Sequence, residues 1–331
     1  MWIEAFSEGK NLDDPEANED RFLALPGRGF AVIDGVTDRT GHRYDGTLAG
    51  RMASRTVQAA VAGFLIDPAE RAADPERLVA HVSAAIRAAY RTHGILDIAH
   101  KDATRRFGAT LALAVEQGAW LRFILVGDSG LRINGDETVI NDTGLDLVTS
   151  SLRQEAYRVI AAAGGSPEDQ AKLGRACAFE GAARLHPDMA PWLDACGLAT
   201  LRDRCLKLCR ARFPEVPEAD LRMLIGGGIM RGQTQFQNNT ASPLSYAVLD
   251  GFEVPMSLVR VIDRPRAEIH SVELFTDGYF APGATPDVAA WEAAFAEVER
   301  VDPGKIDRYP SVKGTIGRLR ADDRTVVIVV F

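Results

Sequence analysis

Short apolar runs toward the two ends of the chain, separated by segments with helical spacing, indicate the architecture. Runs rich in Val, Ile, Leu and Phe predict strands at Phe30–Ile33, Thr110–Val115, Leu121–Val126, Val272–Phe275 and Thr325–Val330, with a further one at Tyr246–Leu249. Apolar residues that recur every three or four positions predict helices at Thr47–Leu65, Glu76–Thr92 and Pro286–Val298. This distribution predicts an α+β fold built in layers.

The middle of the chain has a different pattern. Between about residues 150 and 212 it is helical and rich in Ala, Leu and Arg. No Pro/Gly/Ser-rich linker separates this stretch from its flanks, so we expect one domain over residues 1–331 with a helical insertion at about 146–240. The run Gly226-Gly227-Gly228 lacks the G-K-[S/T] of a phosphate-binding loop, and a flexible connection is the preferred interpretation.

Composition and charge narrow the class of protein. The 331 residues are 46% hydrophobic, enough for a large core. The formal net charge of -8 argues against nucleic acid or an anionic membrane as the main partner. The N-terminus has no signal-peptide pattern, and the run Val326–Phe331 is too short to span a bilayer, so we expect a cytoplasmic protein.

The four cysteines gather in one middle segment, which does not suggest a disulfide framework. They are Cys177, Cys196, Cys205 and Cys209. Reduced thiols are the preferred interpretation. A zinc site that includes His186 is the alternative, but the segment has no C-x-x-C pair and its spacing is helical.

Aspartates at the ends of apolar runs carry the chemical information. Three predicted strands are followed by Asp34, Asp128 and Asp277, and a fourth begins after Asp322-Asp323. If the strand after Asp322 lies antiparallel to the strand before Asp277, its start meets the other's end. We therefore expect these carboxylates to share one edge of the fold.

Clustered carboxylates repel one another and raise each other's pKa unless a cation neutralises them. Oxygen ligands without an organised Cys or His set favour Mg²⁺ or Mn²⁺. Gly35, after Asp34, lets the backbone approach closely, so that its carbonyl can also bind an ion. A single Asp-Gly pair after a strand is more often a turn, as we expect for Asp250-Gly251. The prediction therefore depends on the ordered set.

The order of these motifs resembles that of the metal-dependent serine/threonine protein phosphatases of type 2C. The matching stretches are N-E-D-R at Asn18–Arg21, A-V-I-D-G at Ala31–Gly35, A-G-R-M-A-S at Ala49–Ser54, G-A-T-L at Gly108–Leu111, G-D-S at Gly127–Ser129, T-D-G at Thr276–Gly278 and D-D-R-T-V-V-I-V at Asp322–Val329. The resemblance covers most of residues 11–145 and 245–331. It implies a four-layer α-β-β-α sandwich of two antiparallel sheets flanked by helices.

The resemblance also implies a dinuclear Mg²⁺ or Mn²⁺ centre at one end of that sandwich. Asp34 would bridge the two ions, and Asp277 and Asp322 would hold one of them. Glu19 and the Gly35 carbonyl would hold the other.

Further acidic residues match positions around that centre. Asp20 would support it from behind the ligands, as would Asp323, which stands where an asparagine is common. Asp128 matches an acidic position near a third, weaker metal site. Gly130 and Ala281 replace an arginine and an aspartate of the family pattern, which puts occupancy of that third site in doubt.

Two departures concern the substrate. Where the family has an arginine that binds the substrate phosphate, four residues before Glu19, this chain has Pro15; Lys10 or Arg231 are the candidates to replace it. Val36 stands where some members have a histidine that protonates the leaving group, and the nearby His42 is the candidate for that role.

These observations predict a phosphatase that hydrolyses phosphoserine or phosphothreonine esters of a phosphoprotein with metal-activated water. A catalytically inactive phosphatase fold that binds a phosphoprotein is one alternative, and a phosphatase of small phosphoesters is another. The segment Gly127–Gly130 also resembles the nucleophile segment of secreted serine proteases, with Ser129 as nucleophile. No Gly-Pro follows it, and no histidine lies in a matching context.

Overall fold

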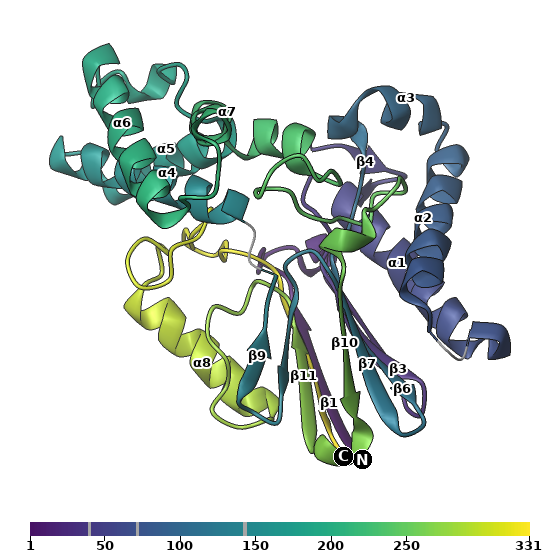
Figure 1. The fold of residues 1–331 in the computed structure, drawn as a ribbon. Coiled ribbons are helices and arrows are strands. Elements are labelled where there is room, and N and C mark those ends of the chain that lie inside the picture. The colour runs from purple at the N-terminus through teal and green to yellow at the C-terminus, as the bar shows by residue number, and fades with distance from the viewer. Residues whose placement is uncertain (39–40, 71–72, 142–143) are drawn as a thin grey trace. The chain divides into compact units, whose positions relative to one another are not determined.

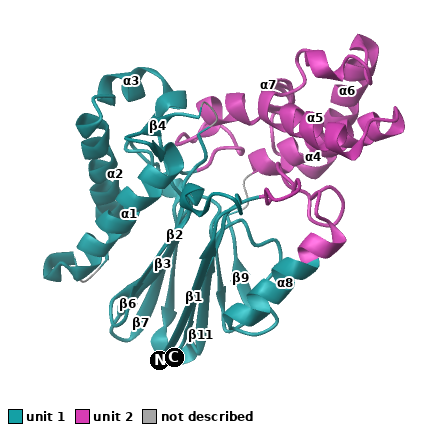
Figure 2. Ribbon diagram, turned by 180° about the vertical axis from the view of Figure 1, so that it is seen from behind, with its two compact units in different colours: residues 1–141, 247–297, 322–331 teal, residues 142–246, 298–321 magenta. Residues whose placement is uncertain are grey.

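The computed structural model describes residues 1–38, 41–70, 73–141 and 144–331 (Figure 1). It divides the chain into two compact units, each described by itself (Figure 2). Unit 1 comprises Met1–Asn141, Ala247–Glu297 and Asp322–Phe331. Unit 2 comprises Asp142–Tyr246 and Val298–Ala321. No helix among the described residues is both long and apolar enough to cross a membrane.

Unit 1 contains two five-stranded sheets in which the paired strands are antiparallel. Sheet I has the order β1 (Trp2–Glu8), β12 (Arg324–Val330), β11 (Ser271–Phe275), β8 (Gly130–Ile133) and β9 (Glu137–Val139). Sheet II has the order β10 (Arg260–Pro265), β7 (Trp120–Val126), β6 (Leu111–Gln117), β3 (Gly29–Ile33) and β2 (Arg21–Leu25). A small hairpin joins β4 (Arg43–Tyr44) and β5 (Thr47–Leu48).

Helices cover the outer faces of the two sheets within unit 1. On the side of sheet II lie α1 (Ala49–Ile66) and α2 (Pro75–Thr92), with α3 (Leu96–Lys101) nearby, whereas α8 (Val288–Val301) lies on the side of sheet I (Figure 1). Proline at the first position and the Asp74 carboxylate, which accepts from Arg77 N–H at 3.0 Å, begin α2. The predicted sandwich of two antiparallel sheets flanked by helices is confirmed.

The side chains of a strand alternate between two cores, and this alternation creates the layers. In β3, Ala31 and Ile33 pack under α1 and α2, whereas Phe30 and Val32 pack between the sheets. Every residue of β3 is buried because both of its faces are covered. The same alternation in β12 places Val327 and Val329 between the sheets and Val326 and Ile328 under α8.

Unit 2 is helical. Its helices are α4 (Gly144–Ala162), α5 (Pro167–Glu180), α6 (Ala195–Arg212) and α7 (Glu218–Phe236), which share one apolar core. A capping box, in which Ser166 and Asp169 exchange hydrogen bonds, begins α5. That this helical region is an insertion within a single domain stays a prediction.

Two local predictions are wrong. Tyr246–Leu249 is not a strand, since Tyr246 and Leu249 make only isolated bridges, to Gln237 and Ala109. The glycine run is not a flexible connection but lies inside α7, where Gly228 makes a kink at φ 61°. A Cβ at Gly228 would lie 2.5 Å from the Gly181 nitrogen, so close packing requires glycine there.

Candidate metal centre

The strand ends of unit 1 bring the predicted aspartates into electrostatic contact. Burial raises the pKa of Asp34 well above its usual range, and the negative charges of four other aspartates raise it further. These four are Asp20, Asp277, Asp322 and Asp128. Residues from both ends of the chain therefore contribute to one acidic cluster.

Pairing between β11 and β12 fixes one side of this cluster. Phe275 lies opposite Val326, so the end of β11 meets the start of β12. The Thr276 N–H donates to the Thr325 carbonyl at 3.0 Å, and the Thr325 N–H donates to Thr276 Oγ1 at 2.9 Å. The antiparallel arrangement expected from the sequence thus places Asp277 and Asp322 at the same edge.

Two glycines allow the backbone to approach closely on the Glu19 side of the cluster. Gly35 follows β3 and Gly50 lies in the first turn of α1. A Cβ built on Gly50 would lie 2.5 Å from Glu19 Oε1 and 2.6 Å from the Gly35 carbonyl oxygen. Both oxygens therefore face the space that a side chain at position 50 would fill.

Two carboxylates at the cluster are buried with incomplete hydrogen bonding. Glu19 is 1% exposed, and its Oε1 has no hydrogen-bond partner among the described residues. Asp20 is 0% exposed; its Oδ2 accepts from Thr276 Oγ1 at 2.8 Å, whereas Oδ1 has no such partner in the described part of the chain. Burial, together with the charge of Asp323, raises the pKa of Asp20 to about 7. Buried oxygens of this kind are costly unless a cation or water satisfies them.

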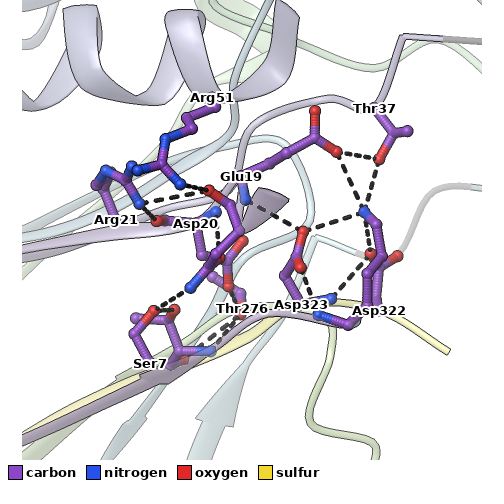
Figure 3. A network of polar contacts seen from close by, with 12 residues as sticks. Ser7, Glu19, Asp20, Arg21, Thr37, Arg51, Thr276, Asp322 and Asp323 are labelled. Carbon is purple, nitrogen blue, oxygen red and sulfur yellow. Dashed lines mark hydrogen bonds and ion pairs between the residues drawn. The ribbon is translucent and has the colours of Figure 1, made fainter. Parts of the chain in front are cut away.

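Lys10 provides the positive charge within the cluster. Its Nζ donates to Glu19 Oε2 at 3.2 Å, to Asp322 Oδ1 at 3.1 Å and to Asp323 Oδ2 at 3.0 Å. It also donates to Thr37 Oγ1 at 2.9 Å, and that hydroxyl donates to Glu19 Oε2 at 2.7 Å. Figure 3 shows Glu19 and Thr37 meeting Asp322 and Asp323 in this network.

The donor chemistry fits a hard divalent ion, but the side-chain positions do not yet form a closed site. Carboxylate and carbonyl oxygens are the ligands that Mg²⁺ and Mn²⁺ prefer. Within residues 1–38, 41–70, 73–141 and 144–331, however, no group of three or more His, Cys, Asp and Glu side chains is arranged to hold an ion. The physical reason near Glu19 and Asp322 is that the Lys10 ammonium engages both carboxylates.

The other predicted residues lie as follows. Asp128 follows β7, and its charge contributes to the raised pKa of Asp34. The backbone N–H of His42 donates to Asp38 Oδ2 at 2.9 Å, and its Nδ1 is 3.8 Å from the same oxygen. Arg231 belongs to α7 in unit 2.

Asp250, which was expected to form only a turn, has a structural role. It is 0% exposed, its Oδ1 accepts from the Phe252 N–H at 3.0 Å, and its Oδ2 pairs with Arg106 at 3.2 Å.

The cysteines are free thiols, as predicted. Cys205 and Cys209 lie one helical turn apart in α6, with their sulfurs 3.9 Å apart, and Cys177 contacts Met189. The alternative of a zinc site that includes His186 stays a prediction.

Sequence reasoning missed Thr37 and the role of Gly50. A threonine after a strand has no distinctive signal, and its contact with Lys10 depends on the folded loop. Gly50 belongs to the A-G-R-M-A-S stretch, whose small residues were the available signal.

Comparisons with known proteins give structural similarity only. No protein-family model and no curated protein matches the chain. The Mycobacterium tuberculosis serine/threonine phosphatase PstP/Ppp is 18% identical, with a TM-score of 0.47 and coverage of 99% of this chain and 97% of that chain. A structure of its catalytic domain with 2 manganese ions has the same identity and score.

Two further phosphatases match with similar values. Stp1 from Staphylococcus aureus is 11% identical, with a TM-score of 0.46 and coverage of 100% of this chain and 95% of that chain. A bacterial serine phosphatase is 12% identical, with a TM-score of 0.46 and coverage of 100% and 97%. Each of these solved structures aligns with nearly the whole of this chain, at identities of 11–18%.

Proposed function

We propose that this protein is a metal-dependent phosphatase of phosphoserine and phosphothreonine esters. The observation that supports the proposal is the pairing of β11 with β12, which brings Asp277 and Asp322 to one sheet edge, near enough to Asp34 for their charges to raise its pKa. A bound divalent cation would offset the repulsion between these like charges.

The chain's own residues would divide the work of holding two Mg²⁺ or Mn²⁺ ions. Asp34 would be shared, with Asp277 and Asp322 on one side and Glu19 and the Gly35 carbonyl on the other. Such ions, when bound, supply an activated water and neutralise charge on the phosphoryl group.

Several residues would position this arrangement without binding an ion themselves. Asp20 holds Thr276 through a hydrogen bond of 2.8 Å, and Thr276 in turn connects β11 to β12. Asp323 accepts from the Lys10 N–H at 2.6 Å and from the Glu19 N–H at 3.3 Å. Asp128 is the candidate for a third, weaker site.

Three residues are candidates for contact with the substrate: Lys10, Arg231 and His42. Lys10 is the better placed candidate for contact with a substrate phosphate, since it already lies within unit 1 beside Glu19 and Asp322. Arg231 and, for leaving-group protonation, His42 stay predictions. We propose a phosphoprotein as substrate and the cytoplasm as the location.

The decisive experiment measures metal-dependent hydrolysis of p-nitrophenyl phosphate and of a phosphothreonine peptide. Purified protein stripped with EDTA should be inactive and should regain activity with Mn²⁺ or Mg²⁺. Asp34→Asn should abolish the activity, whereas Asp263→Asn, on the exposed face of β10, should not.

The strongest alternative function is phosphoprotein binding without hydrolysis. The observation that favours it is Pro15, which stands where the related phosphatases have an arginine that binds phosphate. Phosphopeptide binding without turnover, in the presence of saturating Mn²⁺, would establish this alternative. Turnover of small phosphoesters but not of phosphopeptides would instead identify a small-molecule phosphatase.

A further inference from the structure

The pairing of β1 with β12 places Lys10 in the acidic cluster. In sheet I, Glu8 lies opposite Arg324, so the residues after β1 lie beside those that precede β12. The Lys10 N–H donates to Asp323 Oδ1 at 2.6 Å, which anchors its backbone. Its side chain is 17% exposed, and four acceptor oxygens lie within hydrogen-bond distance of the three N–H donors at Nζ.

The partners of Lys10 are the groups that a metal would use. Glu19 belongs to one proposed ion position and Asp322 to the other, and both accept hydrogen bonds from the same ammonium. An ammonium and a divalent ion that share these carboxylates would repel each other strongly at such separations. Both cannot occupy the cluster in the present arrangement.

We infer that Lys10 is a built-in counter-cation that stabilises the metal-free cluster and competes with metal ions for Glu19 and Asp322. The inference rests on the proposed metal centre and adds to it a residue that sets ion affinity. When the ion binds, the ammonium must leave Glu19 and Asp322.

The charge balance supports this exchange. The cluster contains seven carboxylates and the single Lys10 ammonium, whose charge balances one of them. The carboxylates are those of Glu19, Asp20, Asp34, Asp128, Asp277, Asp322 and Asp323. With one ammonium among seven carboxylates, the cluster favours the approach of divalent cations.

The test is a calorimetric titration of EDTA-stripped protein with Mn²⁺. Lys10→Met removes the charge and keeps an unbranched side chain that is one atom shorter. Lys101→Met is the matched control, because Lys101 is an exposed residue at the end of α3 in the same unit. The weaker of the bound ions should bind at least about tenfold more tightly to Lys10→Met than to the wild type. The control should match the wild type.

Thermal unfolding gives an independent measurement. Lys10→Met should unfold at a lower temperature than the wild type without metal, because its carboxylates lose their counter-cation. Saturating Mn²⁺ should close that gap, since the ion replaces the ammonium. A variant that stays unfolded with Mn²⁺ would show that an ion does not take the place of Lys10 and would overturn the inference.

The titration also separates this inference from the proposed function. Equal Mn²⁺ affinities for the wild type and Lys10→Met, or weaker binding by the variant, would refute only the role of Lys10. Failure of all three proteins to bind Mn²⁺ or Mg²⁺ would refute the proposed metal centre as well.

Discussion

The substitution Gly50→Ala tests the geometry on the Glu19 side of the candidate centre. The new Cβ would lie 2.5 Å from Glu19 Oε1, 2.6 Å from the Gly35 carbonyl oxygen and 2.8 Å from the Val36 carbonyl oxygen. An ordinary carbon–oxygen contact is about 3.3 Å, so these atoms must move by roughly 0.5–0.8 Å. The Glu19 carboxylate can rotate, but the two carbonyls belong to the backbone.

The expected effect follows from the sensitivity of such sites to position. Displacement of a reacting group by about 1 Å costs roughly 100-fold in rate, so a shift of this size should cost about 10- to 100-fold. Overpacking should also destabilise the fold by about 1–3 kcal/mol. The assays are Mn²⁺ titration, turnover of p-nitrophenyl phosphate and unfolding in urea.

The same helix provides the control. Gly63 is exposed in α1, and a Cβ added there meets nothing within 4 Å. Gly63→Ala should leave Mn²⁺ affinity unchanged and stabilise the protein by about 0.5–1 kcal/mol, because alanine has the higher helix propensity. If Gly50→Ala binds Mn²⁺ as tightly as Gly63→Ala, the Gly35 carbonyl and Glu19 do not form an ion site.

Three further predictions concern charge. Asp34→Asn should abolish metal-dependent turnover. It should also raise the free energy of unfolding of the metal-free protein, measured in urea, because it relieves repulsion with the neighbouring aspartates. A lower stability of the metal-free variant would contradict this account. The pKa of Asp20 is raised to about 7, and those of Glu19 and Asp34 are raised too. Above about pH 4, the folded state therefore binds more protons than the unfolded chain. The stability of the metal-free protein should then fall as the pH rises from about 4 to about 7. Unfolding curves in EDTA at several pH values would show this fall, and a flat profile would argue against it. Asp250→Ala should cost about 2–3 kcal/mol because Arg106 loses its buried partner, yet leave Mn²⁺ affinity of the folded protein unchanged; calorimetry at low temperature separates the two effects.

The sequence predicts well the strands whose local pattern of apolar residues matches their burial in the folded protein. Strands β3 and β12 read as apolar runs because both of their faces are covered, and the aspartates at their ends needed no further information. Their convergence could be expected from antiparallel pairing alone. The pairing of β11 with β12 is antiparallel, as that expectation requires, and the metal site itself stays a prediction.

The elements that sequence reasoning missed lie mainly at sheet edges. Strand β1 is partly exposed, and its sequence WIEAFSE mixes polar and apolar residues without a continuous run. Strand β10, at the edge of sheet II, contains two arginines and an aspartate, as exposed edge strands often do. Because β1 was missed, the contact of Lys10 with Asp323, 313 residues away in the chain, could not be foreseen.

The order of strands in sheet I has a consequence for biosynthesis. Strand β12, the last in the chain, lies between β1 and β11. Until the ribosome has released residues 324–330, those two neighbours present unpaired edges that can recruit other chains. The pairing of residues 2–8 with residues 324–330 closes a very long loop of chain, which also slows folding. We therefore expect chains that lack residues 324–330 to depend on chaperones.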